Sequence, residues 1–178
     1  LLGDSATTGT AISADNPPTI ASTNLVADSG AFGMCTYTGN ATAGATVQHS
    51  LGGVPDMIMF KRFGATTANW VVYFKELGAG NSDYLMLDLA LAEGGAGAIN
   101  WLNSTAATST LVTLGNDGNT NASDTYIMYL FRNVPGVCKV GSYTGNGNND
   151  GPYVSVGFSP RYILVRSTSA TRNWNTLD

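Results

Sequence analysis

The chain has 178 residues, of which 43% are hydrophobic and 11% are charged, against roughly 25% charged residues in ordinary soluble domains. Eight basic and twelve acidic side chains give a formal net charge of −4, which excludes a nucleic-acid-binding face because such a face needs clustered cations. Glu and Lys, which usually cover helices, are scarce, whereas Gly, Thr, Asn and Ser are abundant. This composition is typical of strands joined by turns.

Residues 1–31 are rich in Ser, Thr and Ala and contain Asn16-Pro17-Pro18, which predicts an extended lead-in segment rather than a folded unit. The chain contains no run of about 18 consecutive apolar residues, so we expect no membrane insertion. It begins at Leu1 without the pattern of a secretory signal. We therefore expect a fragment of a longer protein.

Short apolar segments separated by Gly- and Asn-rich turns follow this lead-in. Leu85, Leu87, Leu89 and Leu91 occur at every second position, which predicts a strand with four leucines on one face. The alternative is a short helix over residues 83–93, but it would scatter these leucines around its axis. Residues 126–131 form a continuous apolar run that predicts a central strand covered on both faces. The remaining predicted strands are 34–38, 45–49, 56–62, 70–75, 110–114, 138–143 and 161–167.

The sequence also repeats itself. Tyr-Thr-Gly-Asn at residues 37–40 recurs at 143–146, residues 51–61 align with 156–166, and Asn69-Trp70 aligns with Asn173-Trp174. Blocks in the same order at a nearly constant offset indicate tandem modules. We predict an all-β fold of antiparallel, β-sandwich-like modules. The first module spans residues 32–136, and residues 137–178 begin a second, incomplete copy.

Distinctive motifs occur in the second half of the chain, at residues 124–131, 134–136, 141–147, 150–153, 157–160 and 173–174. They resemble a tandem module of unknown function that occurs in large, tail-fibre-like virion proteins of tailed bacteriophages, chiefly marine ones. The resemblance covers residues 32–178 and brings no catalytic residues. It implies a non-enzymatic structural component on the exterior of the virion, a tail fibre or similar appendage that attaches to the host.

The resemblance also implies the partners. We expect a homo-oligomer, a trimer by analogy with fibres, in contact with other virion proteins and with a host cell-surface glycan. One alternative is a capsid or tail decoration protein that stabilises the particle. Another is an appendage that degrades polysaccharide, for which carboxylates would have to converge in a cleft at a separation of roughly 5–10 Å. The candidate carboxylates are Glu76, Asp83, Asp88 and Glu93. The alternative interpretation is that they are solvated groups near turns.

The sequence offers little else for catalysis. His49 is the only histidine, so a Ser-His-Asp or histidine metal site must use it. It lies at the end of a predicted strand, however, and is expected to be a turn or surface residue. Cys35 and Cys138 are expected to be buried apolar residues rather than a disulfide. We therefore expect no enzymatic activity and no cofactor.

Two kinds of binding residue remain. Asn- and Asp-rich loops place oxygen atoms at alternate positions, as a calcium loop does, but lack the later bidentate acidic residue, and the same residue types favour tight turns. The repeated aromatic residues offer faces that could stack on sugars, although core packing is the alternative. The calcium-loop candidates are Asp117, Asn119, Asn121, Asn146, Asn148 and Asp150, and the sugar-stacking candidates are Trp70, Trp174, Tyr37 and Tyr143.

Overall fold

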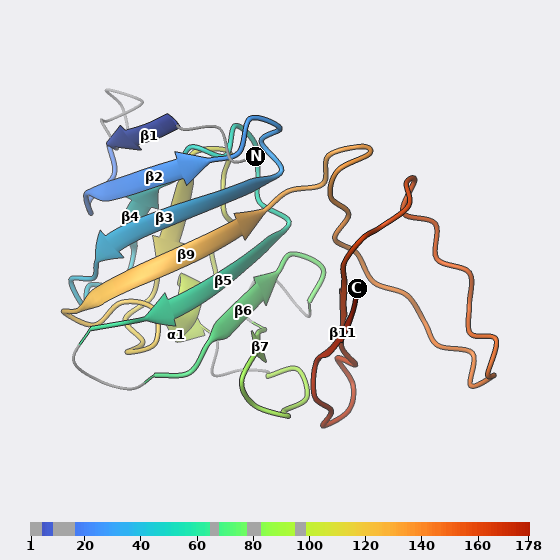
Figure 1. The fold of residues 1–178 in the computed structure, drawn as a ribbon. Helices are drawn as coiled ribbons and strands as arrows, with labels where there is room; N and C mark the ends of the chain where they lie inside the picture. Colours follow the sequence, from blue (N-terminus) through green and yellow to red (C-terminus); the bar gives the residue numbers. More distant parts are fainter. Residues whose placement is uncertain (1–4, 9–16, 65–67, 78–82, 95–98) are drawn as a thin grey trace.

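A computed structural model describes residues 5–8, 17–64, 68–77, 83–94 and 99–178 of the chain. Within these residues, seven strands form one antiparallel sheet in the order β1-β2-β3-β9-β5-β6-β7 (Figure 1). β9 therefore lies at the centre, hydrogen-bonded to β3 on one edge and to β5 on the other. The strands are β1 (Ser5–Thr8), β2 (Ser22–Val26), β3 (Phe32–Thr38), β5 (Met57–Arg62), β6 (Val71–Phe74), β7 (Leu85–Met86) and β9 (Thr125–Phe131).

A second, smaller layer covers one face of this sheet. It consists of the antiparallel pair β4 (Ala45–Gln48) and β8 (Leu111–Leu114), with a single helical turn, α1 (Ile99–Leu102), beside β8. Val47, Val112 and Leu114 from this layer pack in one buried cluster with Phe60 and Tyr126 from the large sheet. The two antiparallel layers confirm the predicted all-β class and agree with a β-sandwich.

Strand alternation separates the two faces of the large sheet. Along β3 and β9 every second residue is buried, so that Cys35, Tyr37, Tyr126 and Met128 point into the core between the layers. The opposite face, which we call the outer face, carries half-buried residues such as Tyr129. The predicted central strand is therefore confirmed in position, but its outer face is only partly covered. A second cluster, which we call the outer cluster, lies there and includes Met59, Val72, Phe74, Leu77 and Leu85, with Val140, Leu164 and Trp174 packed against it.

The predicted leucine strand is wrong beyond its first two residues. Only Leu85 and Met86 form β7, while Leu89 and Leu91 are exposed. The reason is the length of the neighbouring strand, because β6 begins at Val71 and the backbone N–H of Leu87 donates its hydrogen bond to Trp70, just before β6. Among the described residues no further strand pairs with the chain there, and the chain bends. The alternative helix over residues 83–93 is not formed either.

The predicted extended lead-in also differs over its described part. β2 pairs with β3 along its whole length, β1 pairs with β2, and Ile20 is buried in the core. This part of residues 1–31 therefore packs with the first module. Residues 1–4 and 9–16, including Asn16, lie outside the described residues.

The other predicted strands are found at 34–38, 45–49, 56–62, 70–75 and 110–114, with small shifts in their ends. The strand predicted at 138–143 is not formed. The strand predicted at 161–167 is shorter, β10 (Ile163–Val165), and pairs with β11 (Asn175–Leu177). This hairpin lies beside the β6–β7 end of the large sheet (Figure 1), where the indole N–H of Trp174 donates to the carbonyl of Met86 at 2.9 Å.

Candidate functional site

Threonine hydroxyls gather at one end of the outer face. Strand alternation puts Thr36 and Thr38 on the face opposite Cys35 and Tyr37. The sheet register places Thr23 of β2 beside Thr36, and Thr125 of β9 beside Thr38. Three neighbouring strands therefore present hydroxyl groups to the same surface.

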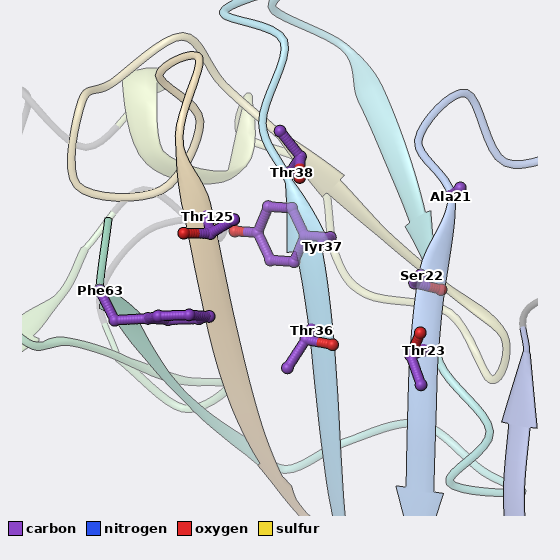
Figure 2. Close-up of a pocket in the computed structure, with 8 residues that line it drawn as sticks. All are labelled: Ala21, Ser22, Thr23, Thr36, Tyr37, Thr38, Phe63 and Thr125. Atoms are coloured by element: carbon purple, nitrogen blue, oxygen red, sulfur yellow. The ribbon is translucent and has the colours of Figure 1, made fainter. Parts of the chain in front are cut away.

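Phe63 completes this surface. It follows the end of β5, and its backbone N–H donates to the carbonyl of Thr125 at 3.0 Å, which holds it beside β9. Its side chain is 56% exposed. Figure 2 shows the Phe63 ring lying beside β9 and pointing towards Thr36. Thr125 lies above the ring in this view, and Thr23 is farther away, on β2 beyond β3. We call Phe63 with Thr23, Thr36, Thr38 and Thr125 the threonine surface.

The threonine surface borders an open hollow of about 330 Å³, to which Ala21, Ser22 and Tyr37 also contribute. The hydroxyls of its four threonines make no hydrogen bond within the described part of the chain, so they are available to a ligand. None of the described residues that line the hollow carries a charged side chain. An aromatic ring beside uncharged hydroxyls suits a neutral, polar ligand with an apolar face.

A half-buried ion pair fixes the backbone under this surface. Arg62 donates from Nε to Asp124 Oδ2 at 2.7 Å, and the backbone N–H of Thr125 donates to Asp124 Oδ1 at 2.8 Å. Gly64 is required by this arrangement, since a Cβ atom there would lie 1.3 Å from Asp124 Oδ1. The Asp124 carboxylate thus holds Thr125 directly, through its backbone N–H. It holds Phe63 indirectly, because its partner Arg62 precedes Phe63 in the chain.

Tyr37, one of the predicted sugar-stacking residues, serves the core instead. Its ring stacks on Tyr126 with centroids 5.2 Å apart, and its hydroxyl donates to the carbonyl of Thr120 at 2.6 Å. Burial raises the pKa of Tyr37 well above its ordinary value. Although Tyr37 borders the hollow, its buried ring has no face free for a sugar. The sequence shows an aromatic residue in a strand but not which face of the strand is buried.

The other three aromatic candidates occupy different environments. Trp70 is half-buried and stacks on Tyr129, with ring centroids 5.9 Å apart. Trp174 is half-buried beside the outer cluster, whereas Tyr143 is exposed. The residue that the sequence analysis missed is Phe63. The available signal was the Thr36-Tyr37-Thr38 alternation, which indicates a hydroxyl-bearing strand face.

The calcium-loop candidates make hydrogen bonds within the protein. Asp117 Oδ1 accepts from the backbone N–H and the side-chain amide of Asn119, and Asn119 Oδ1 accepts from the backbone N–H of Asn69. Asn121 is fully buried and bonded to Asn40, Thr42 and Gly115. In the second loop, Asn146 Oδ1 accepts from the backbone N–H of Asn148, and Asp150 is exposed. These contacts give the loops a structural role as turns.

Two of the four acidic candidates, Asp88 and Glu76, hold other parts of the chain. Asp88 Oδ1 accepts from the backbone N–H of Trp70, and Glu76 Oε2 accepts from the Ser142 hydroxyl at 2.9 Å. The part of the hollow's lining that the structure describes contains no carboxylate. Across the described ranges, no group of three or more His, Cys, Asp or Glu side chains is arranged to hold a metal ion. The same ranges contain no helix long and apolar enough to cross a membrane.

His49 and Cys35 are buried in the core, whereas Cys138 is half-buried. The expectation of a turn or surface histidine is wrong, because His49 is buried, with Nε2 3.1 Å from the carbonyl of Thr108. Burial lowers the pKa of His49. Both cysteines are free thiols, as expected, but only Cys35 is buried as expected, since Cys138 is half-buried. Burial raises the pKa of Cys35 to about 12.

Fold and site together define an all-β, two-layered domain with an uncharged, hydroxyl-rich surface. The chain matches a family model described as "Domain of unknown function (DUF7483)" over residues 6–178, and it belongs to this family. No curated protein and no solved structure matches it.

Proposed function

We propose that this chain is a non-enzymatic structural module on the exterior of a tailed-bacteriophage virion. In this role it forms part of a tail fibre or similar appendage and contacts a neutral glycan of the host surface through the threonine surface. The virion assignment depends on the sequence resemblance of residues 32–178. The glycan assignment depends on one observation, the exposed Phe63 ring beside four threonine hydroxyls without partners in the described chain.

The chemistry of the threonine surface supports a sugar ligand. The C–H face of a pyranose packs on an aromatic ring, while its hydroxyls exchange hydrogen bonds with hydroxyl partners. The described lining residues carry no charge, which disfavours phosphate or uronic-acid groups, because these require cations. An open hollow of this kind binds weakly, so a homo-oligomer that presents several copies would attach by avidity.

Binding to immobilised glycans tests the glycan part of this proposal. We expect the purified chain to bind neutral bacterial-surface oligosaccharides in preference to acidic ones, and Phe63→Ala to weaken binding about tenfold, as the loss of one stacking contact of about 1.4 kcal/mol would. Val54→Ala is the matched control, since Val54 is also exposed but precedes β5, whereas Phe63 follows it. Equal binding by wild type and Phe63→Ala would remove the threonine surface as the glycan site.

Gold-labelled antibodies against the chain test its place on the particle. We expect label on tail or baseplate appendages of the intact phage. Label on the capsid would instead favour the decoration role, and particles without label would contradict the virion assignment.

A further inference from the structure

The β10–β11 hairpin reproduces the β5–β6 hairpin pair by pair. In the first copy Ile58, Met59 and Phe60 lie opposite Tyr73, Val72 and Val71. Ile163, Leu164 and Val165 are the residues that align with that β5 segment, and they lie opposite Leu177, Thr176 and Asn175. Each of these partners also aligns with its β6 counterpart. The repeat seen in the sequence is therefore a repeat of strand register.

A cation above the tryptophan is reproduced as well. Lys61 Nζ lies 5.4 Å from the centroid of the Trp70 ring, and Arg166 Cζ lies 5.5 Å from that of Trp174. Lys61 aligns with Arg166, and Trp70 aligns with Trp174. Two sequence-matched pairs with the same geometry identify β10–β11 as the start of a second module.

The two hairpins differ in what covers them. In the first copy the core-facing Ile58 and Tyr73 are 0% and 4% exposed, whereas their counterparts Ile163 and Leu177 are 41% and 59% exposed. Tyr143, the counterpart of the buried Tyr37, is 54% exposed. The opposite side of the second hairpin is covered, because Leu164 and Trp174 pack against the outer cluster. The second hairpin thus presents the equivalent of a core face to solvent.

The edge of β10 that faces away from β11 is also free. In the first copy the corresponding edge of β5 is paired with β9, with Ile58 opposite Leu130 and Phe60 opposite Met128. In the described residues β10 has β11 as its sole strand neighbour. Residues 137–178 align with the part of the first copy that precedes β7, so they include no counterpart of β9. An unpaired edge of this kind is a template for another strand.

We propose that the free edge of β10 binds an antiparallel strand of the β9 type. The register of the first copy defines this partner, because it must place apolar side chains opposite Ile163 and Val165, as Leu130 and Met128 lie opposite Ile58 and Phe60. The partner is thus a strand of about seven residues with alternating apolar side chains, supplied by a β module of this family. β9 of this chain does not qualify, since β3 and β5 already occupy both of its edges.

The test extends the full chain with a second copy of its own residues 75–136, joined after Asp178, which aligns with Phe74. Hydrogen exchange is then measured at the backbone N–H groups of residues 163–165. We expect exchange there to slow about 100-fold or more relative to the unextended chain, because pairing buries the free edge. The matched control carries Met128→Asp in the added copy only, which places a charge on the face that must be buried, and it should give no protection.

A peptide comprising residues 123–133 provides a second measurement that does not require the extension to fold. When it is titrated into the full chain, amide NMR signals of Ile163 and Leu177 should shift, whereas those of Ile58 and Tyr73 should not. If neither the extension nor the peptide alters β10, the proposal is wrong. Protection of β10 by dimerisation of the unextended chain would also overturn it, because the partner would then be a second hairpin. Neither measurement depends on glycan binding or on the virion assignment.

Discussion

Asn133 holds Val140 through both polar atoms of its side-chain amide. Its Nδ2 donates to the carbonyl of Val140 at 3.1 Å, and its Oδ1 accepts from the backbone N–H of Val140. The backbone N–H of Asn133 in turn donates to the buried carboxylate of Asp56 at 2.6 Å. Residues 137–178 are therefore tied to the first module at the point where they leave it.

Replacing Asn133 by Ala should loosen residues 137–178 without unfolding the large sheet. The change removes both hydrogen bonds to Val140 but keeps the backbone bond to Asp56. We expect the β10–β11 hairpin to be cleaved several-fold faster by a protease in a limited digest, since local opening costs less free energy once such contacts are gone.

Ser142→Ala is the matched control for this experiment. It removes only the exposed hydrogen bond from Ser142 to Glu76, which is worth little in water. If Asn133→Ala and Ser142→Ala were digested at the same rate, the hydrogen bonds of Asn133 would not be what holds residues 137–178 to the first module.

The two repeated tyrosines, Tyr37 and Tyr143, should respond differently to loss of their hydroxyls. Tyr37→Phe leaves the carbonyl of the fully buried Thr120 without its partner, which should lower the free energy of unfolding by about 1–2 kcal/mol. Tyr143→Phe alters an exposed side chain and should change the free energy of unfolding by less than about 0.5 kcal/mol. Urea denaturation with a common m-value measures both. Equal losses would contradict the assignment of Tyr37 to the core.

The sequence predicted the fold class well because alternation and turn chemistry are local signals. Residues 34–38 and 126–131 alternate or run apolar between Gly- and Asn-rich turns, and both are strands. The leucines at 85–91 alternate too, but a strand also needs a partner, and β6 ends the pairing at residue 71. The alternation of the leucines does not show where the neighbouring strand ends, and that end decides how far β7 extends.

The candidate site was less predictable for a related reason. Which residues share a surface depends on register between distant strands, here β2, β3 and β9. Phe63 was missed because it stands outside a strand, while Tyr37 was chosen because it recurs at Tyr143. Recurrence in the sequence did not indicate burial, since Tyr37 is buried in β3, whereas Tyr143 is exposed and lies outside any strand.

The two cysteines should differ strongly in their reaction with a thiol reagent such as DTNB at pH 8. The thiolate is the reactive form, and burial raises the pKa of Cys35 to about 12, while Cys138 is half-buried and its pKa is raised by burial as well. In the folded protein we expect Cys138 to react slowly and Cys35 to react about 100-fold or more slower still. In urea both thiols should react equally fast. Cys35→Ser and Cys138→Ser assign the two phases. A fast-reacting Cys35 in the native protein would show that the core opens readily.

His49 should make the fold sensitive to acid. Its Nε2–H donates to the carbonyl of Thr108, and its Nδ1 accepts from the backbone N–H of Leu51, an arrangement that requires the neutral ring. Because burial lowers the pKa of His49 in the folded state, the unfolded state binds its proton first, near pH 6.5. The stabilisation is therefore complete above that pH and is lost as the pH falls towards the folded-state pKa.

Urea denaturation of wild type and His49→Gln between pH 5 and pH 8 isolates this contribution, because the carboxylates titrate equally in both proteins. His49→Gln should be less stable at pH 8, since the ring and its two hydrogen bonds are lost. The free energy of unfolding of His49→Gln should then fall less steeply towards pH 5 than that of the wild type. The two slopes should differ by up to about 1.4 kcal/mol per pH unit, which is the slope that one proton produces. Parallel pH profiles would mean that His49 is protonated as readily in the folded state as in the unfolded state, which its burial between Thr108 and Leu51 opposes.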